Sequence, residues 1–363
     1  MPDLSPRLTK AKKVAFFVAT LVVILLAAEI AVRAIDPPAV RPAYYGYPPD
    51  LIVPDSVLGH KYRAGFRGFF PARRYHQIPI AINSQGFRDD EWKPRPDPAC
   101  PRVMVIGDSI TFGAPVFKEQ RFAEVAARML RERGRCIETC NCGVNGFNID
   151  RYETVLTNLG PALAPRIVVI GLCLNDIEPA SPDDDYQKQM LEARNEKDER
   201  WPLFVDRYRL DLGKSYAVAL LRAAWLELRW KSNPSMMNQR YTEDVKKHLE
   251  RDFARPSARE HLSERLAAMS RFCQTRLDAK LMVLVLPYRH ELAERDPHLS
   301  LIIDGMLEAR RIPHLDLYDV FLPQADAKGL YAYKDDCHPD VLGHSLAGAA
   351  LANWLENAGF GGL

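Results

Sequence analysis

The hydrophobic pattern of the chain begins with one long apolar segment near the N-terminus. Residues 14–28 are apolar except for Thr20, and five more apolar residues lie within 30–35. About 20 predominantly apolar residues suffice for a helix to cross a bilayer, so this pattern predicts a transmembrane helix. Four basic residues stand within the first 13. They predict a cytoplasmic N-terminus and a chain that lies outside the cytoplasm after residue 36.

A cleaved signal peptide is the alternative interpretation of this segment. It is disfavoured because no clear small-x-small cleavage site follows the apolar run. Residues 36–56 are rich in Pro and Tyr, which is typical of an extended tether. Short extended pieces are expected over 59–92, and a second Pro-rich stretch leads to residue 102.

From residue 102 the pattern changes to apolar runs separated by amphipathic segments. The apolar runs predict buried strands at 103–106, 137–141, 167–172, 280–286 and 312–317. Helical periodicity is found over 119–133, 257–277 and 341–357. Continuous apolar strands separated by helices predict an α/β fold, a parallel sheet covered on both faces.

Three parts of the chain are therefore expected. Residues 1–35 form a cytoplasmic tail and transmembrane signal anchor, and residues 36–101 a Pro-rich linker with a small extended segment. Residues 102–363 form the main domain. A charged insertion at about 178–277 separates its third and fourth strands.

Composition excludes some function classes. The chain has 49 Lys+Arg against 47 Asp+Glu, a formal net charge of +2, so no nucleic-acid footprint is expected. Seven cysteines fit an exported protein with one or two disulfides and at least one free thiol. Cys136, Cys140 and Cys142 lack the CxxC spacing and the companion histidine of a zinc site. No metal and no organic cofactor is expected.

Four polar clusters follow the predicted strands, where ligands bind in parallel α/β sheets. They are GDS (107–109), NCGVNG (141–146), GLCLND (171–176) and DDCHP (335–339). Any one of them could be an ordinary loop, because Gly and Asp commonly end strands. Their order and their common position after strands indicate one site.

In this order the clusters resemble the four sequence blocks of the SGNH (GDSL) hydrolases, named after Ser, Gly, Asn and His. The resemblance covers roughly 102–357 and implies a flavodoxin-like sheet in three α/β/α layers. It implies that Ser109 is the nucleophile and His338 the base that removes its proton. The acid that orients His338 is expected at Asp335, three residues earlier, with Asp336 as the alternate acid.

The resemblance also implies an oxyanion hole. Ser109 and Gly143 are expected to offer backbone N–H groups and Asn175 its side-chain amide to the developing negative oxygen. Other polar residues of the blocks have less defined roles. Asp108 is expected to close a turn and His344 to pack, whereas loop capping and substrate contact stay open for Asn145 and Asp176.

An N-terminal anchor, the stretch NSQGFRD (83–89) and a GDS block together resemble bacterial envelope members of this superfamily. The resemblance implies a single-pass inner-membrane protein with a periplasmic serine esterase domain that acts on acyl esters of envelope polysaccharide or lipid. One alternative is an O-acyltransferase with the same triad. The other is a non-catalytic accessory subunit with partners in a membrane complex.

The implied strand order adds an expectation for two cysteines. Cys100 precedes the first strand and Cys136 opens the second, which is its neighbour in a flavodoxin-like sheet. Neighbouring strands lie about 4.8 Å apart, within the Cα separation that a disulfide spans. A Cys100–Cys136 disulfide is expected, with two unpaired thiols as the alternative.

Overall fold

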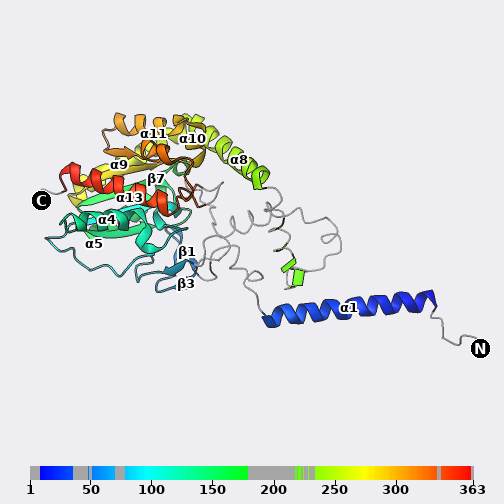
Figure 1. Cartoon of the computed structure of the whole chain (residues 1–363). Helices are drawn as coiled ribbons and strands as arrows, with labels where there is room; N and C mark the ends of the chain where they lie inside the picture. The colour runs from blue at the N-terminus through cyan, green and yellow to red at the C-terminus, as the bar shows by residue number, and fades with distance from the viewer. Residues whose placement is uncertain are drawn as a thin grey trace, which may run out of the picture.

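A computed structural model gives the fold of most of the chain (Figure 1). It describes residues 9–35, 48, 51–69, 78–178, 217–218, 220–221, 224, 228, 234–332 and 337–360. Most of the expected tether, most of the insertion before residue 234, and both candidate acids, Asp335 and Asp336, lie outside the described residues.

The N-terminal apolar segment is a single helix, α1 (Lys10–Ile35). It has 26 residues and a mean hydropathy of 2.6, and none of its most apolar stretch is buried in the protein. Near its C-terminal end Arg33 Nε donates to Glu29 Oε1 at 2.7 Å, which pairs the only two charges in that part of the helix. The helix is long and apolar enough to cross a membrane, and a signal sequence would have the same properties.

Two small antiparallel hairpins connect this region to the main sheet. In one, β1 (Ile52–Asp55) pairs with β2 (Gly59–Tyr62), and in the other β3 (Arg67–Phe69) pairs with β4 (Pro79–Ala81). Their inward side chains belong to the same hydrophobic core as the main sheet. For example, the Tyr62 ring lies 5.1 Å from that of Phe112. The hairpins are therefore packed against the main domain.

The main sheet contains five parallel strands in the order β6-β5-β7-β8-β9. They are β5 (Arg102–Gly107), β6 (Glu138–Gly143), β7 (Ile167–Cys173), β8 (Lys280–Leu286) and β9 (His314–Asp316). The order confirms the expected flavodoxin-like sheet. Gly107 at the end of β5 lies in register with Gly143 and Gly171, so three strand ends meet at one edge.

Helices cover both faces of the sheet (Figure 1). On one face α4 (Phe122–Glu132) packs on α13 (Val341–Leu355), and on the other α5 (Ile149–Leu163) packs on α9 (Pro256–Phe272). The remaining helices of eight or more residues in the described main domain are α8 (Pro234–Ala254) and α11 (His298–Ala309). Strand residues such as Val105 and Val169 are completely buried, because helices cover the sheet on both sides.

Cys100 and Cys136 form a disulfide, with their Cα atoms 4.7 Å apart. The bond confirms the sequence prediction. It joins the chain just before β5 to the chain just before β6, at the sheet edge opposite the polar clusters. The cysteines at 140, 142 and 173 are free and buried, as small apolar side chains of the core.

Candidate active site

Ser109 is the first residue of α3 (Ser109–Phe112), directly after the central strand β5. The preceding Asp108 caps this short helix, because its Oδ1 accepts the backbone N–H of Ile110 at 2.8 Å. Oδ2 lies 3.4 Å from Ser109 Oγ. Burial raises the pKa of the Asp108 carboxyl, and the charge of nearby His338 opposes that rise. Asp108 therefore closes the turn that presents Ser109, as expected.

His338 lies in the connection between β9 and α13, far from Ser109 in sequence. Its Nε2 is 2.6 Å from Ser109 Oγ, so the hydroxyl can donate its proton to the ring. The connection is held by backbone hydrogen bonds, one of them from the Ala332 N–H to the His338 carbonyl at 3.0 Å. The structure thus brings the expected nucleophile and base together.

The other ring nitrogen of His338, Nδ1, needs a partner that orients the ring, and both candidate acids lie outside the described residues. Within the described residues, Cys337 Sγ lies 3.9 Å from His338 Nδ1. A thiol at this distance is a weak partner compared with the carboxylate that orients histidine in serine hydrolases. The assignment of Asp335 or Asp336 stays a prediction.

Gly143 ends β6 beside Ser109's helix, but its backbone N–H is already engaged. It donates to Asn141 Oδ1 at 3.0 Å. A Cβ at Gly143 would lie 2.3 Å from the backbone nitrogen of Phe112, so glycine is required for α3 to pack against β6. This close packing, rather than access for a substrate, explains the glycine, and the hydrogen bond argues against Gly143 as an oxyanion donor.

Gly146, three residues later, is the stronger candidate. It is exposed at the carboxyl end of β6 and has φ 74°. Its N–H makes no hydrogen bond within the described part of the chain. The sequence does not single out Gly146, because two glycines stand in the same loop. Spacing alone does not show which N–H remains available.

Asn175 lies in η4 (Leu174–Ile177), the turn that follows β7, and is exposed to solvent. The neighbouring Asp176 is fully buried and accepts the Cys173 N–H at 2.7 Å and the Tyr152 hydroxyl at 2.8 Å. Burial, and then the charge of Asp108, raises the pKa of Asp176 well above its usual value. Asp176 therefore caps the loop and leaves Asn175 as the side chain of η4 directed to solvent.

Asn145 lies in the buried part of the loop after β6. Its N–H donates to the Tyr62 hydroxyl at 2.9 Å, and its carbonyl lies 2.9 Å from His60 Nε2. Both partners come from β2, so the N-terminal hairpin fixes the loop that carries Gly146.

Comparison with known proteins agrees with this geometry. Residues 105–346, more than half of the chain, match the family model of the GDSL-like lipase/acylhydrolase family. The chain belongs to this family. It is therefore an ester-hydrolysing serine hydrolase.

Several solved structures match the chain at low sequence identity. The structure named TesA is 13% identical, with a TM-score of 0.42, over 70% of this chain and 98% of its own. A G-D-S-L lipolytic protein from Veillonella parvula is 12% identical, with a TM-score of 0.40, over 70% and 97%. The acetylxylan esterase Axe2 from Geobacillus stearothermophilus is 14% identical, with a TM-score of 0.41, over 71% and 94%. A search of curated proteins finds no match.

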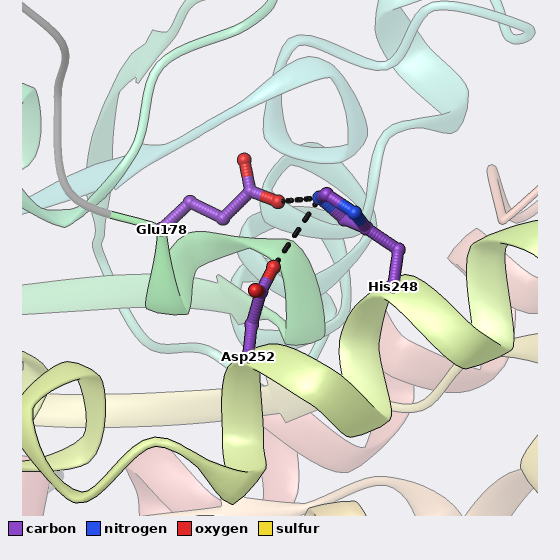
Figure 2. A group of neighbouring side chains, drawn as sticks. All are labelled: Glu178, His248 and Asp252. Atoms are coloured by element: carbon purple, nitrogen blue, oxygen red, sulfur yellow. Dashed lines mark hydrogen bonds and ion pairs between the residues drawn. The ribbon is translucent and has the colours of Figure 1, made fainter.

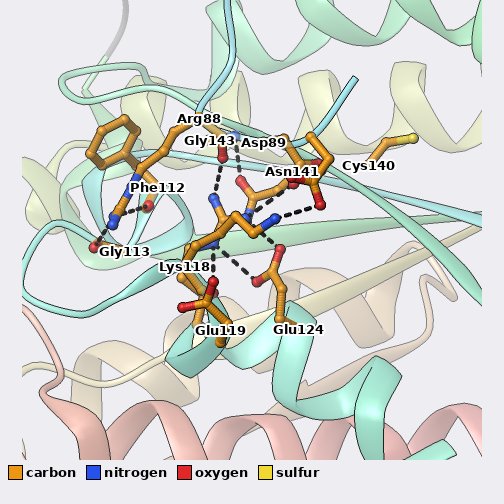
Figure 3. A network of polar contacts seen from close by, with 12 residues as sticks. Arg88, Asp89, Phe112, Gly113, Lys118, Glu119, Glu124, Cys140, Asn141 and Gly143 are labelled. Carbon is orange, nitrogen blue, oxygen red and sulfur yellow. Dashed lines mark hydrogen bonds and ion pairs between the residues drawn. The ribbon is translucent and has the colours of Figure 1, made fainter. Parts of the chain in front are cut away.

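The last two residues of the stretch NSQGFRD, Arg88 and Asp89, contact the end of α3 and the neighbouring strand β6 (Figure 3). Arg88 is 2% exposed and donates only to backbone carbonyls. Three of these carbonyls, those of Phe112, Gly113 and Val116, lie 3.2, 2.6 and 2.9 Å from the guanidinium nitrogens of Arg88. They are at the end of α3 and just after it. Carbonyls at a helix end have no partner within the helix, so Arg88 satisfies them and fixes α3.

Asp89 and Arg121 complete this support. One Asp89 oxygen accepts the Asn141 N–H at 2.9 Å, and Arg121 donates to the other at 3.3 Å and to the Arg88 carbonyl. Burial, and then the charge of Arg121, lowers the pKa of Arg88 to about 9. The sequence pattern alone indicates no role for this stretch. The feature that the sequence does show is a pair of charged residues, Arg88 and Asp89, directly after Phe87.

His344 has the packing role that was expected. It is completely buried, its ring stacks on Phe122 at 6.0 Å, and its Nδ1 accepts the Phe122 N–H at 3.2 Å. Burial lowers the pKa of His344 to about 3, so the ring is neutral at physiological pH. It joins α13, just after His338, to α4.

A separate groove of about 560 Å³ lies beside the Cys100–Cys136 disulfide. Its walls are mostly charged, and include Asp97, Lys118 and Arg131. Neither Ser109 nor His338 lines it. The groove is therefore not the site of ester hydrolysis.

Proposed function

We propose that this protein is an esterase held in the cytoplasmic membrane by α1, with its GDSL domain outside the cytoplasm. It hydrolyses acyl esters through an acyl-enzyme on Ser109. The contact of 2.6 Å between Ser109 Oγ and His338 Nε2, at the carboxyl end of the central strand, carries the proposal. A serine hydroxyl needs such an adjacent base to become nucleophilic.

The reaction has two steps. His338 accepts the Ser109 proton while Oγ bonds to the ester carbonyl carbon, and collapse of the tetrahedral intermediate breaks the carbon–oxygen ester bond. The leaving alcohol takes the proton from His338. Water then repeats the sequence on the acyl-enzyme and releases the carboxylic acid. Asp335 orients the ring through Nδ1, with Asp336 as the alternate acid.

Three donors stabilise the tetrahedral oxyanion in this proposal. They are the backbone N–H groups of Ser109 and Gly146 and the side-chain amide of Asn175. The strands before these three residues are neighbours, so their carboxyl ends meet. Gly146 replaces Gly143 in this role because the Gly143 N–H donates to Asn141. Such preorganised donors typically contribute about 3–4 kcal/mol each to catalysis.

Two observations support the extracytoplasmic location. The Cys100–Cys136 disulfide is of a kind that persists in oxidising compartments. The basic residues before α1 favour a cytoplasmic N-terminus. Residues 1–35 are then the anchor, 36–101 the linker with its hairpins, and 102–363 the hydrolase domain with the insertion at 178–277. Acyl esters of envelope polysaccharide or lipid are the substrates within reach of a domain held at that surface.

An ester panel tests this function. The detergent-solubilised protein is incubated with acetyl and longer acyl esters of sugars and glycerol, and the released acid is measured. We expect acid release by the wild type and loss by at least about 10³-fold in His338→Ala, because the general base is gone. His298→Ala serves as the control, because this ring pairs with Asp296 outside the site.

Equal turnover in His338→Ala and the wild type would refute the mechanism. Absence of turnover across the panel would favour an accessory subunit. Acyl transfer to an added polysaccharide hydroxyl in preference to water would favour the transferase.

A further inference from the structure

A second group of chemically active side chains lies where the insertion meets the catalytic domain (Figure 2). Glu178 directly follows η4, and His248 and Asp252 lie one turn apart on the same face of α8. His248 Nε2 contacts Glu178 Oε1 and lies 3.2 Å from Asp252 Oδ2. Each of the three residues offers one ligand atom, and these three atoms all lie within 4.8 Å of one another.

Asp252 points into this group from a buried position. Its side chain is 1% exposed. Oδ1 accepts hydrogen bonds from Arg255 at 2.8 Å and Arg251 at 3.3 Å, whereas the buried Oδ2 has no hydrogen-bond partner. A buried carboxylate oxygen without a donor is costly, on the order of 1–3 kcal/mol. This oxygen lies 3.2 Å from His248 Nε2 without the geometry of a hydrogen bond, so an ion bound by both atoms would satisfy it.

Glu178 adds a second carboxylate to the same group. Carboxylate oxygens within 4.8 Å of one another repel when both groups are charged. A cation between them would remove the repulsion.

We propose that Glu178, His248 and Asp252 bind one divalent transition-metal ion, for which Zn²⁺ is the natural probe. One imidazole nitrogen and two carboxylate oxygens form a donor set that suits Zn²⁺, at about 2.0–2.2 Å from the ion. Tetrahedral ligands at that distance lie about 3.4 Å apart. His248 Nε2 and Asp252 Oδ2 are 3.2 Å apart, whereas Glu178 Oε1 is in closer contact with Nε2 and must move outward when the ion enters. Water fills the fourth position, because Glu178 and His248 are partly exposed.

The surrounding arginines set a condition for binding. Arg251 approaches His248 Nδ1 at 2.7 Å, which makes Nδ1 an acceptor and places the ring proton on Nε2. A metal on Nε2 requires that proton to move to Nδ1 and the Arg251 contact to open. The Arg251 side chain is 65% exposed and can turn to solvent at little cost. Since all three ligands must be deprotonated, affinity falls in acid.

Such an ion would join two parts of the chain that function together. Glu178 follows the turn that contains Asn175, and α8 belongs to the insertion. The Glu178 carbonyl also accepts from the Asn148 side chain at 3.0 Å, so the turn is already held on its other side. The ion would therefore hold α8 of the insertion against this turn. The proposal does not depend on the esterase reaction.

Zinc binding to the full chain tests the site. The protein, carrying a tag without histidines and stripped with a chelator, is titrated with Zn²⁺ by calorimetry, and its Tm is measured with and without the ion. We expect one Zn²⁺ per chain and a higher Tm in the wild type. His248→Ala should lose binding, and Glu178→Gln, at a partly exposed position, should weaken it at least tenfold while it folds normally.

His261→Ala is the matched control. This histidine also contacts a carboxylate, Asp150, at 2.8 Å, but belongs to no comparable three-ligand group among the described residues. It should bind Zn²⁺ as the wild type does. Failure of the folded wild type to bind Zn²⁺ at millimolar concentration, or wild-type affinity in both His248→Ala and Glu178→Gln, would overturn the proposal.

Discussion

At the scale of single residues, the site depends on side chains that never contact substrate. Arg88 is the main example, because its guanidinium fixes the carbonyls at the end of the helix that begins with Ser109. A shift of about 1 Å at a nucleophile can reduce the rate by about 10². Such a shift of Ser109 slows the chemical step more than it weakens binding of the ester.

We expect Arg88→Lys to lower kcat at least tenfold with a smaller change in KM. Lysine keeps the charge but cannot reach carbonyls in several directions at once. Steady-state kinetics and thermal unfolding of the same preparations check this. Arg259→Lys is the control, because Arg259 also donates to a backbone carbonyl, that of Phe253, but in α9. Unchanged kcat in a folded Arg88→Lys protein would show that Arg88 does not position Ser109.

His344 gives a residue-scale prediction for pH. Its pKa is about 3 in the folded protein, against about 6.5 for an unperturbed histidine. Below pH 6.5 the unfolded chain binds a proton that the folded protein excludes, so stability is full above that pH and falls in acid. Between pH 7 and 5 this amounts to about 2 kcal/mol.

Urea unfolding at pH 7 and pH 5 measures this effect. His344→Asn, which does not titrate, should lose about 2 kcal/mol less than the wild type between the two pH values. His290, whose pKa burial lowers to about 4, remains in both proteins and cancels in the comparison. An equal loss in the wild type and the variant would show that His344 is already protonated or solvated when folded.

The sequence predicted Ser109 and His338 for one candidate site because their blocks follow strands in a fixed order, and the structure brings the two side chains together. It did not distinguish Gly143 from Gly146. That distinction depends on the hydrogen bond from the Gly143 N–H to Asn141, a contact that spacing does not encode. Arg88 was missed for a related reason, since its partners are backbone carbonyls, which have no sequence signature.

At the scale of elements, the buried strands were predicted best, because strands covered on both faces form continuous apolar runs. The last strand is shorter than expected, His314–Asp316 rather than 312–317, and lies at the edge of the sheet. The helices α5 and α11 were not specified from the pattern. In α5 the pair Gly160 and Pro161 resembles a helix end, although the helix continues to Leu163.

The Cys100–Cys136 disulfide gives the element-scale prediction. It closes a loop with a sequence separation of 36 around β5 and α4. In the chain-entropy model such a loop corresponds to about 4 kcal/mol of stabilisation. We expect the double variant Cys100→Ser, Cys136→Ser to lose about 2–4 kcal/mol in urea unfolding and to keep its fold.

The single variants Cys140→Ser and Cys273→Ser are useful references, because both thiols are free and buried. Both keep the Cys100–Cys136 disulfide, so they should lose stability on reduction as the wild type does, whereas the double variant should be equally stable with and without reductant. If reduction left the wild type unchanged, the disulfide would not contribute to stability.

At the scale of the whole molecule, the proposed anchor α1 would set the compartment in which the reaction takes place. The helix α1 is followed by a domain whose disulfide suits an oxidising compartment. We expect protease added to intact spheroplasts to digest the GDSL domain and to leave a protected N-terminal fragment. Protection of the domain until lysis would reverse the orientation, and a mature protein without residues 1–35 would favour the signal peptide.

The central claim is that Ser109 is a nucleophile activated by His338, and covalent labelling tests it most directly. The purified protein is treated with a fluorophosphonate probe, which forms a stable phosphonyl ester with an activated serine, and the labelled peptide is identified by mass spectrometry. We predict one labelled site, at Ser109, and complete loss of labelling in a folded Ser109→Ala variant. Labelling that persists in Ser109→Ala, or no labelling of the folded wild type, would contradict the account.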